Sequence, residues 1–181
     1  MRQAAEQNAP IRTAFVAVGS NIEPERNIPA ALEALARFVR VTGSSTFYRT
    51  APVARPGQPA FYNGVFQAQT GLAARALKFD VLRPIEERLG RVRTADKDAP
   101  RTIDLDLLLC GDEVIDTPEL RLPDPEIRVR PFVAVPLLEL CPELLLPGTG
   151  EPLRAFPAAR ASQALERLTE FTHQLRKRLE K

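Results

Sequence analysis

The sequence predicts an α+β fold, a ferredoxin-like split βαβ sandwich in which helices pack on a mainly antiparallel sheet. The first observation is the order of the hydrophobic patterns, which run strand, helix, strand, strand, helix, strand along the chain. The second is size, because 181 residues with 44% hydrophobic content can build one domain with a substantial core. No internal repeat or low-complexity tract argues against this fold, and a further helix is expected at the C-terminus.

The first strand and the first helix follow a polar start. Residues 1–12 show no pattern and are expected to form a loose N-terminal extension. The apolar run 14–18 ends at Gly19-Ser20-Asn21, which predicts a buried strand that enters a tight loop. A helix is expected to open at Pro29, because proline is tolerated in the first helical turn. Its predicted apolar stripe consists of Ile28, Leu32, Leu35 and Phe38.

Two strands follow, separated by a proline-rich loop. Residues 39–48 predict a strand that is interrupted or turned near Gly43. Residues 51–59 contain too many prolines for regular structure and are expected to form the loop. Residues 61–70 alternate apolar and polar positions, as a strand does.

The second helix and the clearest strand come next. A helix is expected over residues 73–89, with a kink or an early break caused by Pro84. A charged loop over 90–100 then leads into a strand over 102–109. Alternation places the strand's side chains on two faces, with Ile103, Leu105 and Leu107 on one and Asp104 and Asp106 on the other.

The last third contains shorter elements. Residues 113–115 can form a short hairpin arm, and a loop over 118–131 precedes a short helix near 132–140. A final helix is expected over 162–181. Its predicted apolar stripe consists of Leu165, Leu168, Phe171, Leu175 and Leu179.

The charge and the composition exclude several classes of protein. The formal charge of +2, from 25 basic and 23 acidic residues, gives no general attraction to nucleic acid or to a membrane surface. Two cysteines are too few for a disulfide framework, and no apolar run approaches the roughly 20 residues of a membrane span. The N-terminus lacks an apolar signal core, so a cytoplasmic location is expected.

Asp104 and Asp106 are the strongest chemical feature. Their spacing on a strand brings both carboxylates to one face, where two like charges are unfavourable unless a cation or an arginine lies between them. Magnesium prefers oxygen ligands and binds through one or two carboxylates together with substrate phosphates. The alternative is a solvated strand face, which the bare Asp-x-Asp pattern does not exclude.

Three arginines lie close to this pair in sequence, namely Arg91, Arg93 and Arg101. Guanidinium groups suit phosphate oxygens and stabilise the charge that develops in phosphoryl transfer. A carboxylate pair with these arginines therefore favours a phosphoryl-transfer site, although a solvated turn has a similar composition. The sequence contains no G-x-x-x-x-G-K-[ST] phosphate loop and neither the HRD nor the DFG element of protein kinases.

Several ordered blocks make the interpretation more specific. They are AVGSN, FYRTAPV, FYNGV and GRVRTADKDAPRTIDLDLLLCG. Together they resemble the 6-hydroxymethyl-7,8-dihydropterin pyrophosphokinase family over residues 14–152, and the PRTIDLD run is the most specific of them. The resemblance implies transfer of a diphosphate from ATP to the pterin in folate biosynthesis, with AMP and the pterin diphosphate as products.

The resemblance also implies an organisation and a set of ligands. Residues 13–152 would form the pyrophosphokinase domain and residues 153–181 a C-terminal helical extension. Two Mg²⁺ ions are expected, with ATP and the pterin as small-molecule substrates. No nucleic acid or membrane partner is expected, and the protein would be a monomer or a weak homo-oligomer.

Individual roles follow from the matching positions. The catalytic group would be Arg91, Arg101, Asp104 and Asp106, with both aspartates as metal ligands. The nucleotide side would include Glu86, Arg93, Leu107 (through its backbone), Arg121, Asp124 and Arg130. The pterin side would include Thr50, Ala51, Val53, Phe61, Asn63 and Phe132. The two phenylalanines would form apolar walls against the two faces of the pterin ring, although without the resemblance they would be taken as core residues.

The chain departs from the family pattern at three positions. Asp98 and Ala99 stand where tryptophan and glycine are usual, and Asp124 stands where a histidine is common. An acid near a triphosphate repels it unless a metal or an arginine compensates. These departures leave open a second reading, a pterin- or nucleotide-binding module with weakened catalysis. A ferredoxin-like RNA-binding domain is a more remote alternative, since the sequence has no RNP-type aromatic cluster. The single histidine, His173, is expected to be a solvated helix residue.

Overall fold

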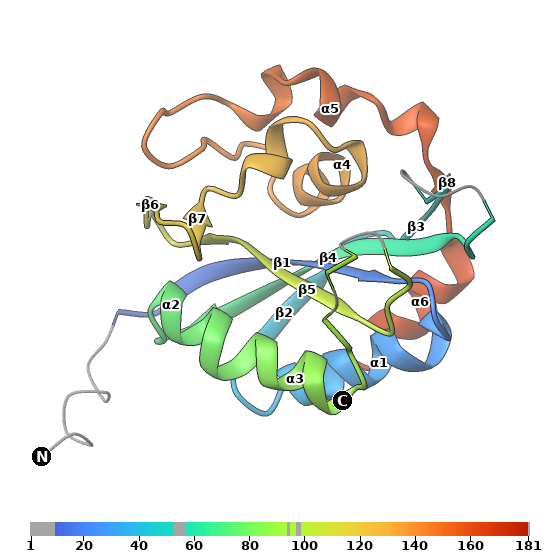
Figure 1. Ribbon diagram of the computed structural model, residues 1–181. Helices are drawn as coiled ribbons and strands as arrows, with labels where there is room; N and C mark the ends of the chain where they lie inside the picture. Colours follow the sequence, from blue (N-terminus) through green and yellow to red (C-terminus); the bar gives the residue numbers. More distant parts are fainter. Residues whose placement is uncertain (1–9, 53–56, 94, 97–98, 181) are drawn as a thin grey trace, which may run out of the picture.

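A six-stranded antiparallel sheet forms the centre of the protein (Figure 1). The computed structural model describes residues 10–52, 57–93, 95–96 and 99–180. The strand order of the sheet is β5-β1-β4-β3-β8, and β2 also pairs with β4. The strands are β1 (Arg12–Ser20), β2 (Arg40–Ser44), β3 (Tyr48–Thr50), β4 (Phe61–Thr70), β5 (Asp104–Cys110) and β8 (Glu166–Arg167). This arrangement confirms the predicted α+β class with helices packed on an antiparallel sheet.

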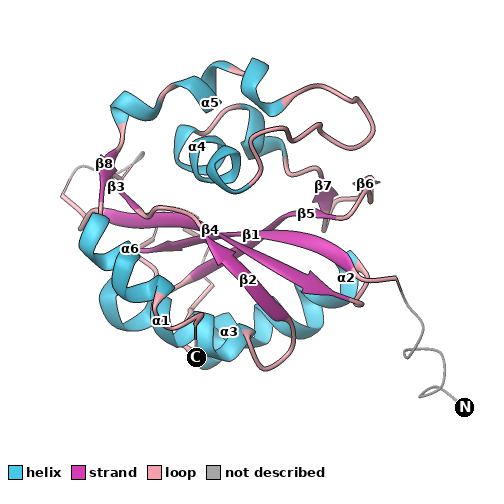
Figure 2. Cartoon of the chain, turned by 180° about the vertical axis from the view of Figure 1, so that it is seen from behind, coloured by secondary structure: helices cyan, strands magenta, loops and turns pink. Residues whose placement is uncertain are grey.

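Helices cover both faces of the sheet (Figures 1 and 2). One face carries α1 (Pro24–Leu35), the continuous run α2 (Ala74–Ala76), η2 (Leu77–Leu82) and α3 (Arg83–Arg88), and α6 (Thr169–Arg176). The other face carries α4 (Pro131–Leu140) and α5 (Pro157–Arg160). Shorter elements are the hairpin β6 (Ile115–Asp116) with β7 (Arg121–Leu122) and the 3₁₀ turns η3 (Pro125–Arg128), η4 (Leu153–Ala155) and η5 (Ser162–Ala164).

Two apolar cores lie on either side of the sheet because side chains alternate along each strand. Val16 and Val18 of β1 join the core beneath α1 and α3, whereas Phe15 joins the core under α4. Ala17 and Gly19, on the same face as Phe15, are small. The α4 face is therefore filled at one end of β1 and left open at the other.

The first helix differs from the prediction at both ends. It begins at Pro24, five residues before Pro29, which lies buried inside the helix. Pro24 satisfies the preference for proline in the first turn, and burial of the Pro29 ring compensates for the backbone hydrogen bond that it cannot donate. Phe38 lies beyond the helix end and is 52% exposed, so its assignment to the apolar stripe was wrong.

Pro84 does not break the second helix. Residues 74–88 remain helical, and the six residues of η2 form a π-helical stretch just before the proline. The wider turn moves the carbonyl of Asp80, four residues earlier, away from the proline ring, which removes the clash that would otherwise end an α-helix.

The C-terminal segment is not a single helix. The predicted helix over 162–181 reduces to α6, because residues 166–167 instead pair as β8 with β3. Leu165 therefore lies ahead of a strand, whereas Leu175 is buried in the core and Phe171 packs against it. The segment closes the sheet beside β3, and its side chains complete the core beneath.

The other predicted elements are confirmed with small shifts. The predicted strand 39–48 appears as β2 and β3, and its register shifts between Val41 and Gly43 as expected. The hairpin arm forms β6, and the short helix 132–140 forms α4. Within the ranges given above, no helix has the length and apolar character needed to cross a membrane.

Gly64 of β4 supplies a test of this packing. A Cβ atom there would lie 2.7–2.8 Å from three ring carbons of the fully buried Phe47. We expect Gly64→Ala to lower the free energy of unfolding by about 1–3 kcal/mol, as overpacking usually does. Gly43→Ala in β2 is the matched control, because its nearest contact is the flexible end of Gln67 at 3.3 Å. Urea denaturation of both variants checks the difference, and equal losses would contradict it.

Candidate active site

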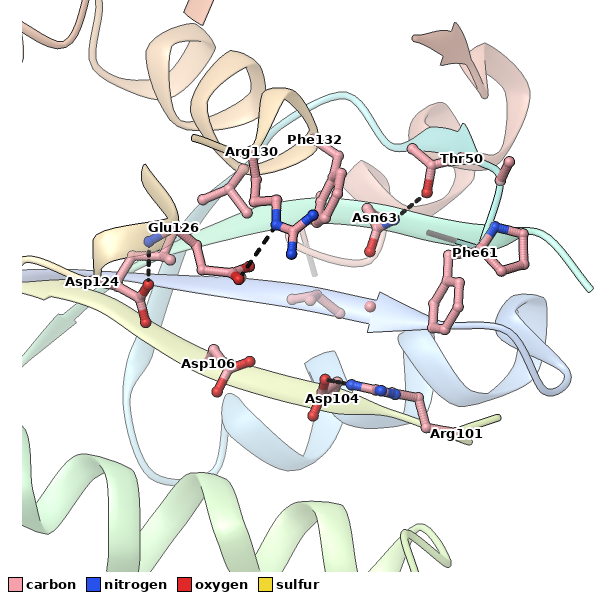
Figure 3. A pocket seen from close by; sticks show the side chains of 18 of the residues that line it. Thr50, Phe61, Asn63, Arg101, Asp104, Asp106, Asp124, Glu126, Arg130 and Phe132 are labelled. Carbon is pink, nitrogen blue, oxygen red and sulfur yellow. Dashed lines mark hydrogen bonds and ion pairs between the residues drawn. The ribbon is translucent and has the colours of Figure 1, made fainter. Parts of the chain in front are cut away.

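A cavity of about 360 Å³ opens on the α4 face of the sheet (Figure 3). Its floor is formed by β1, β4 and β5, and its roof by η3 and the start of α4. Gly19 makes this floor possible, since a Cβ atom there would lie 2.8 Å from the Asn63 amide oxygen. The lining includes most of the predicted site residues, namely Thr50, Ala51, Phe61, Asn63, Arg101, Asp104, Asp106, Asp124, Arg130 and Phe132.

Asp104 and Asp106 both face this cavity, as predicted, while Leu105 between them lies in the opposite core. Arg101 donates a hydrogen bond to Oδ2 of Asp104, and Nη2 of Arg91 lies 3.8 Å from Oδ1. The two arginines are mostly buried, with 18% and 9% of their side chains exposed. Each carboxylate oxygen of Asp104 thus lies near the positive charge of an arginine.

No arginine among the residues described by the structure forms such an ion pair with Asp106. Its side chain is exposed to the water of the cavity, but the surrounding protein walls reduce the hydration of its charged form. This desolvation, followed by repulsion from Asp104, Asp124 and Glu86, raises the pKa of Asp106 to about 7, and Lys78 opposes the rise only partly. A carboxylate held among like charges is suited to a bound cation.

Glu86 and Arg93 lie behind β5 rather than in the cavity lining. The buried Glu86 accepts hydrogen bonds from the Leu105 backbone N–H at 2.8 Å and from Arg93 at 2.5 Å. Burial is the main reason that the pKa of Glu86 is raised. Since β5 is an edge strand, Glu86 satisfies a backbone group that would otherwise lack a strand partner. Here Glu86 supports the strand that carries the aspartates.

The segment after β7 brings Asp124 over the cavity. Asp124 caps η3 by accepting the Glu126 backbone N–H at 2.8 Å, and its own N–H donates to the Leu108 carbonyl at 3.0 Å. Burial raises the pKa of the Asp124 carboxyl. Arg130 also reaches the cavity, where its Nε lies 3.4 Å from Glu126. Hydrogen bonds to backbone groups therefore fix the position of Asp124 in the roof of the cavity.

The other end of the cavity is amphipathic. Asn63 of β4 donates a hydrogen bond to Oγ1 of Thr50 on β3 at 2.7 Å. Phe61 and Phe132 enter from the start of β4 and the start of α4 (Figure 3). The Arg101 guanidinium lies 5.7 Å from the Phe61 ring, so this apolar end adjoins the acid–arginine group. Val53, predicted for this side, lies outside the described residues, as does Asp98.

Asn21 links the acid–arginine end of the cavity to its amphipathic end. Its side chain is buried, accepts the Arg101 N–H at 2.8 Å and donates to the Pro59 carbonyl at 3.3 Å. Ser20 adds a hydrogen bond of 2.6 Å to the Thr102 carbonyl. The Gly-Ser-Asn sequence thus joins the segment before β4 to the segment before β5.

Besides Glu86, Arg91 and Arg93, two further predicted residues do not line the cavity. The Leu107 side chain is buried in the core, which leaves only its backbone for the predicted contact. Arg121 lies on the β6–β7 hairpin, 3.1 Å from Asp116. His173 is exposed on α6, as expected. Among the residues with assigned positions, no group of three or more His, Cys, Asp or Glu side chains is arranged to hold a metal.

Several lining residues escaped sequence reasoning, among them Gln58, Glu126 and Val133. Gln58 lies in an irregular segment and Glu126 in the short 3₁₀ turn η3, and in neither place does a periodicity in the sequence assign a side chain to a face. The small residues Ala17 and Gly19 offered a usable signal, because two small residues at alternate strand positions indicate a hollow on one face.

The fold and the site together define an α+β transferase class, in which an acid–arginine cluster for phosphate chemistry adjoins an aromatic pocket for a flat ring. The family model described as 7,8-dihydro-6-hydroxymethylpterin-pyrophosphokinase (HPPK) matches residues 15–142. The chain belongs to this family, and the resemblance inferred from the sequence blocks is confirmed.

Curated relatives support the same assignment. The chain is 41% identical over 161 residues to the 2-amino-4-hydroxy-6-hydroxymethyldihydropteridine pyrophosphokinase of Pseudomonas aeruginosa, a match that covers 87% of this chain and 98% of the relative. A protein of the same name from Haemophilus influenzae is 37% identical over 140 residues, with 76% and 86% covered.

Solved structures confirm the fold. The chain matches Plasmodium falciparum HPPK-DHPS wild type with pteroate at a TM-score of 0.64 and 13% identity. It matches a second structure, HPPK-DHPS in complex with substrates, at 0.61 and 12%. These matches cover 86% and 84% of this chain but only 43% of each longer chain, so the likeness concerns the fold alone.

The raised pKa of Asp106 predicts a pH-dependent stability cost. The folded protein retains a proton on Asp106 up to about pH 7, whereas the carboxyl of an unfolded chain loses it near its ordinary value of 3.8. Stability from this group is therefore lost as the pH rises through that window. Asp106→Asn carries no such charge, so we expect it to raise the melting temperature more at pH 8 than at pH 5. Thermal unfolding in EDTA at both values checks this, and a pH-independent difference would contradict it.

Proposed function

We propose that this chain transfers a diphosphate from ATP to 6-hydroxymethyl-7,8-dihydropterin, giving AMP and the pterin diphosphate in folate biosynthesis. The observation that carries the proposal is the shared cavity, in which Asp104, Asp106 and Arg101 lie beside an aromatic pocket. Membership of the HPPK family supplies the substrates that such a cavity would bind. In the reaction the pterin hydroxyl oxygen bonds to the β-phosphorus with loss of its proton, and the bond from that phosphorus to the AMP oxygen breaks.

The pterin would occupy the amphipathic end. Its flat ring offers two π faces to Phe61 and Phe132, and ring edges with amide-like donors and acceptors. Asn63 has both a donor and an acceptor, and its hydrogen bond to Thr50 fixes which way the amide points. These contacts would hold the hydroxymethyl group toward the aspartates.

The donor set fits magnesium. Asp104 and Asp106 offer hard oxygen ligands on one strand face, and desolvation together with repulsion from neighbouring acids raises the pKa of Asp106. Two carboxylates suffice when water and phosphate oxygens complete the shell, so a larger group of side chains is not required. Bound Mg²⁺ would neutralise phosphate charge and lower the pKa of the attacking hydroxyl. We expect two ions, as for ATP-bound sites of this family.

The arginines would bind the phosphates. Arg101 and Arg91 already lie on Asp104, and the buried Nε of Arg91 has no hydrogen-bond partner among the described residues. Cations bound at Asp104 would compete for its oxygens, which would release guanidinium donors toward the phosphate charge. Arg130, across the cavity, could contact the other end of the triphosphate. We also expect a cytoplasmic monomer or weak homo-oligomer.

AMP formation tests the proposal directly. With Mg²⁺ and ATP, we expect AMP rather than ADP, and only when 6-hydroxymethyl-7,8-dihydropterin is present. Asp106→Asn should lower turnover by at least about a hundredfold, since charge stabilisation at the transferred group is lost, while the variant stays folded. Chromatography of the nucleotides provides the measurement. Pterin binding without AMP would instead favour the binding module with weakened catalysis.

Gly19→Ala tests the pterin pocket separately. The added methyl would displace the Asn63 amide oxygen, because the new carbon would lie only 2.8 Å from it. We expect pterin affinity to fall roughly tenfold, the usual effect of one lost buried hydrogen bond, while ATP affinity changes little. Fluorescence titration with each ligand checks this, and an equal loss for both would contradict it.

A further inference from the structure

The outer edge of β3 is covered by the C-terminal strap, which we define as residues 165–176. β3 is only three residues long and pairs with β4 on its inner side. On its outer side β8 pairs Tyr48 with Arg167 and Arg49 with Glu166 (Figure 1). The last residue of β3 is Thr50, and Ala51 follows it into the cavity. The strap therefore borders the strand that leads into the proposed pterin site.

Phe47, the residue just before β3, is bound by the strap through both of its backbone groups. The Leu168 N–H donates to the Phe47 carbonyl at 2.9 Å. The Phe47 N–H donates to Oγ1 of Thr172 at 2.9 Å, and both residues are buried. A buried N–H without a partner is costly, so the Thr172 hydroxyl fixes the backbone at the entrance to β3.

Aromatic packing adds to this anchor. The Phe171 ring lies 5.4 Å from Phe47 and 5.4 Å from Tyr62, both in edge-to-face geometry. Phe47 in turn lies directly over Gly64. Tyr62 stands between Phe61 and Asn63 in β4, so the strap contacts both strands that supply the pterin side.

A polar group ties the strap to α4 on the opposite face. Glu139 of α4 accepts hydrogen bonds from the Tyr48 hydroxyl and, at 2.8 Å, from the Thr46 N–H. Arg167 of the strap reaches the same carboxylate at 3.3 Å. Burial and the contact with Glu139 raise the pKa of Tyr48 to about 12, so this hydroxyl stays protonated and keeps donating.

We propose that the strap is a positioning element for the pterin side of the site, with Thr172 as its central residue. It touches no proposed substrate atom and acts through Phe47 and β3 on the placement of Thr50 and Ala51 relative to Asn63. The inference rests on the proposed function. The proposed metal ligands Asp104 and Asp106, and Leu107 of the nucleotide side, lie on β5 at the other end of the sheet, beyond β1 and β4. Loss of the strap's anchor therefore affects pterin binding and spares ATP binding.

Thr172→Val tests this with almost no change of volume, because a methyl replaces the hydroxyl. The full-length variant is titrated with pterin at a saturating level of Mg²⁺ and a non-hydrolysable ATP analogue, and separately with the analogue alone. We expect the pterin dissociation constant to rise roughly tenfold, the effect of one unpaired buried donor, with an unchanged constant for the analogue. Thr172→Ser, which keeps the hydroxyl, retains the pterin affinity of the wild-type protein.

Two controls separate positioning from simple loss of stability. Thr169→Val makes the same exchange at an exposed position of α6 and leaves both affinities unchanged. Leu32→Ala, in the core beneath α1, lowers the melting temperature without changing pterin affinity. Wild-type pterin affinity in Thr172→Val, or an equal loss for both ligands, would overturn the inference. Absence of pterin binding in the wild-type protein would instead overturn the proposed function.

Discussion

The alternation of side chains along β5 is the constraint on which the site depends. Leu105 and Leu107 enter a sealed core, and Asp104 and Asp106 enter the cavity on the opposite face. A slip of one residue would exchange these faces, burying two carboxylates and exposing the leucines. The register is fixed from three sides: by pairing with β1, by Glu86 on the Leu105 N–H, and by the Asp124 N–H on the Leu108 carbonyl.

The same constraint explains why the site is costly to maintain. The cavity gathers Asp106, Asp124 and Glu126 on walls that also hold Asp104, and burial raises the pKa of two of these acids. Arginines pair with Asp104 and, through Arg130, with Glu126, whereas the raised pKa values of Asp106 and Asp124 show that their negative charge is less well balanced. The remaining negative charge favours cation binding, so the property that weakens the empty protein is the one that a metal-dependent transferase would use.

Sequence reasoning recovered most of the fold because strand alternation is a local signal. Asp104 and Asp106 could be placed on one face from their spacing alone, whereas the roles of Thr50, Phe61 and Phe132 came from the family resemblance. The failures had non-local causes. Pro84 was accommodated by a π-helical stretch, and residues 166–167 became a strand only because β3 offers an open edge. Gln58 lies in a loop and Glu126 in the single 3₁₀ turn η3, where tertiary contacts orient the side chains and no period in the sequence reveals their direction.

The contact between Phe47 and Thr172 joins residues 125 positions apart. During synthesis the chain leaves the ribosome from its N-terminus, so β3 emerges long before the residues that cover its outer edge. The outer edge of β3 stays unpaired until residues 166–172 have been synthesised. Closure of so long a loop is also among the slower steps in folding. Nascent chains would therefore contain the acid-bearing strand before the amphipathic end of the cavity is complete.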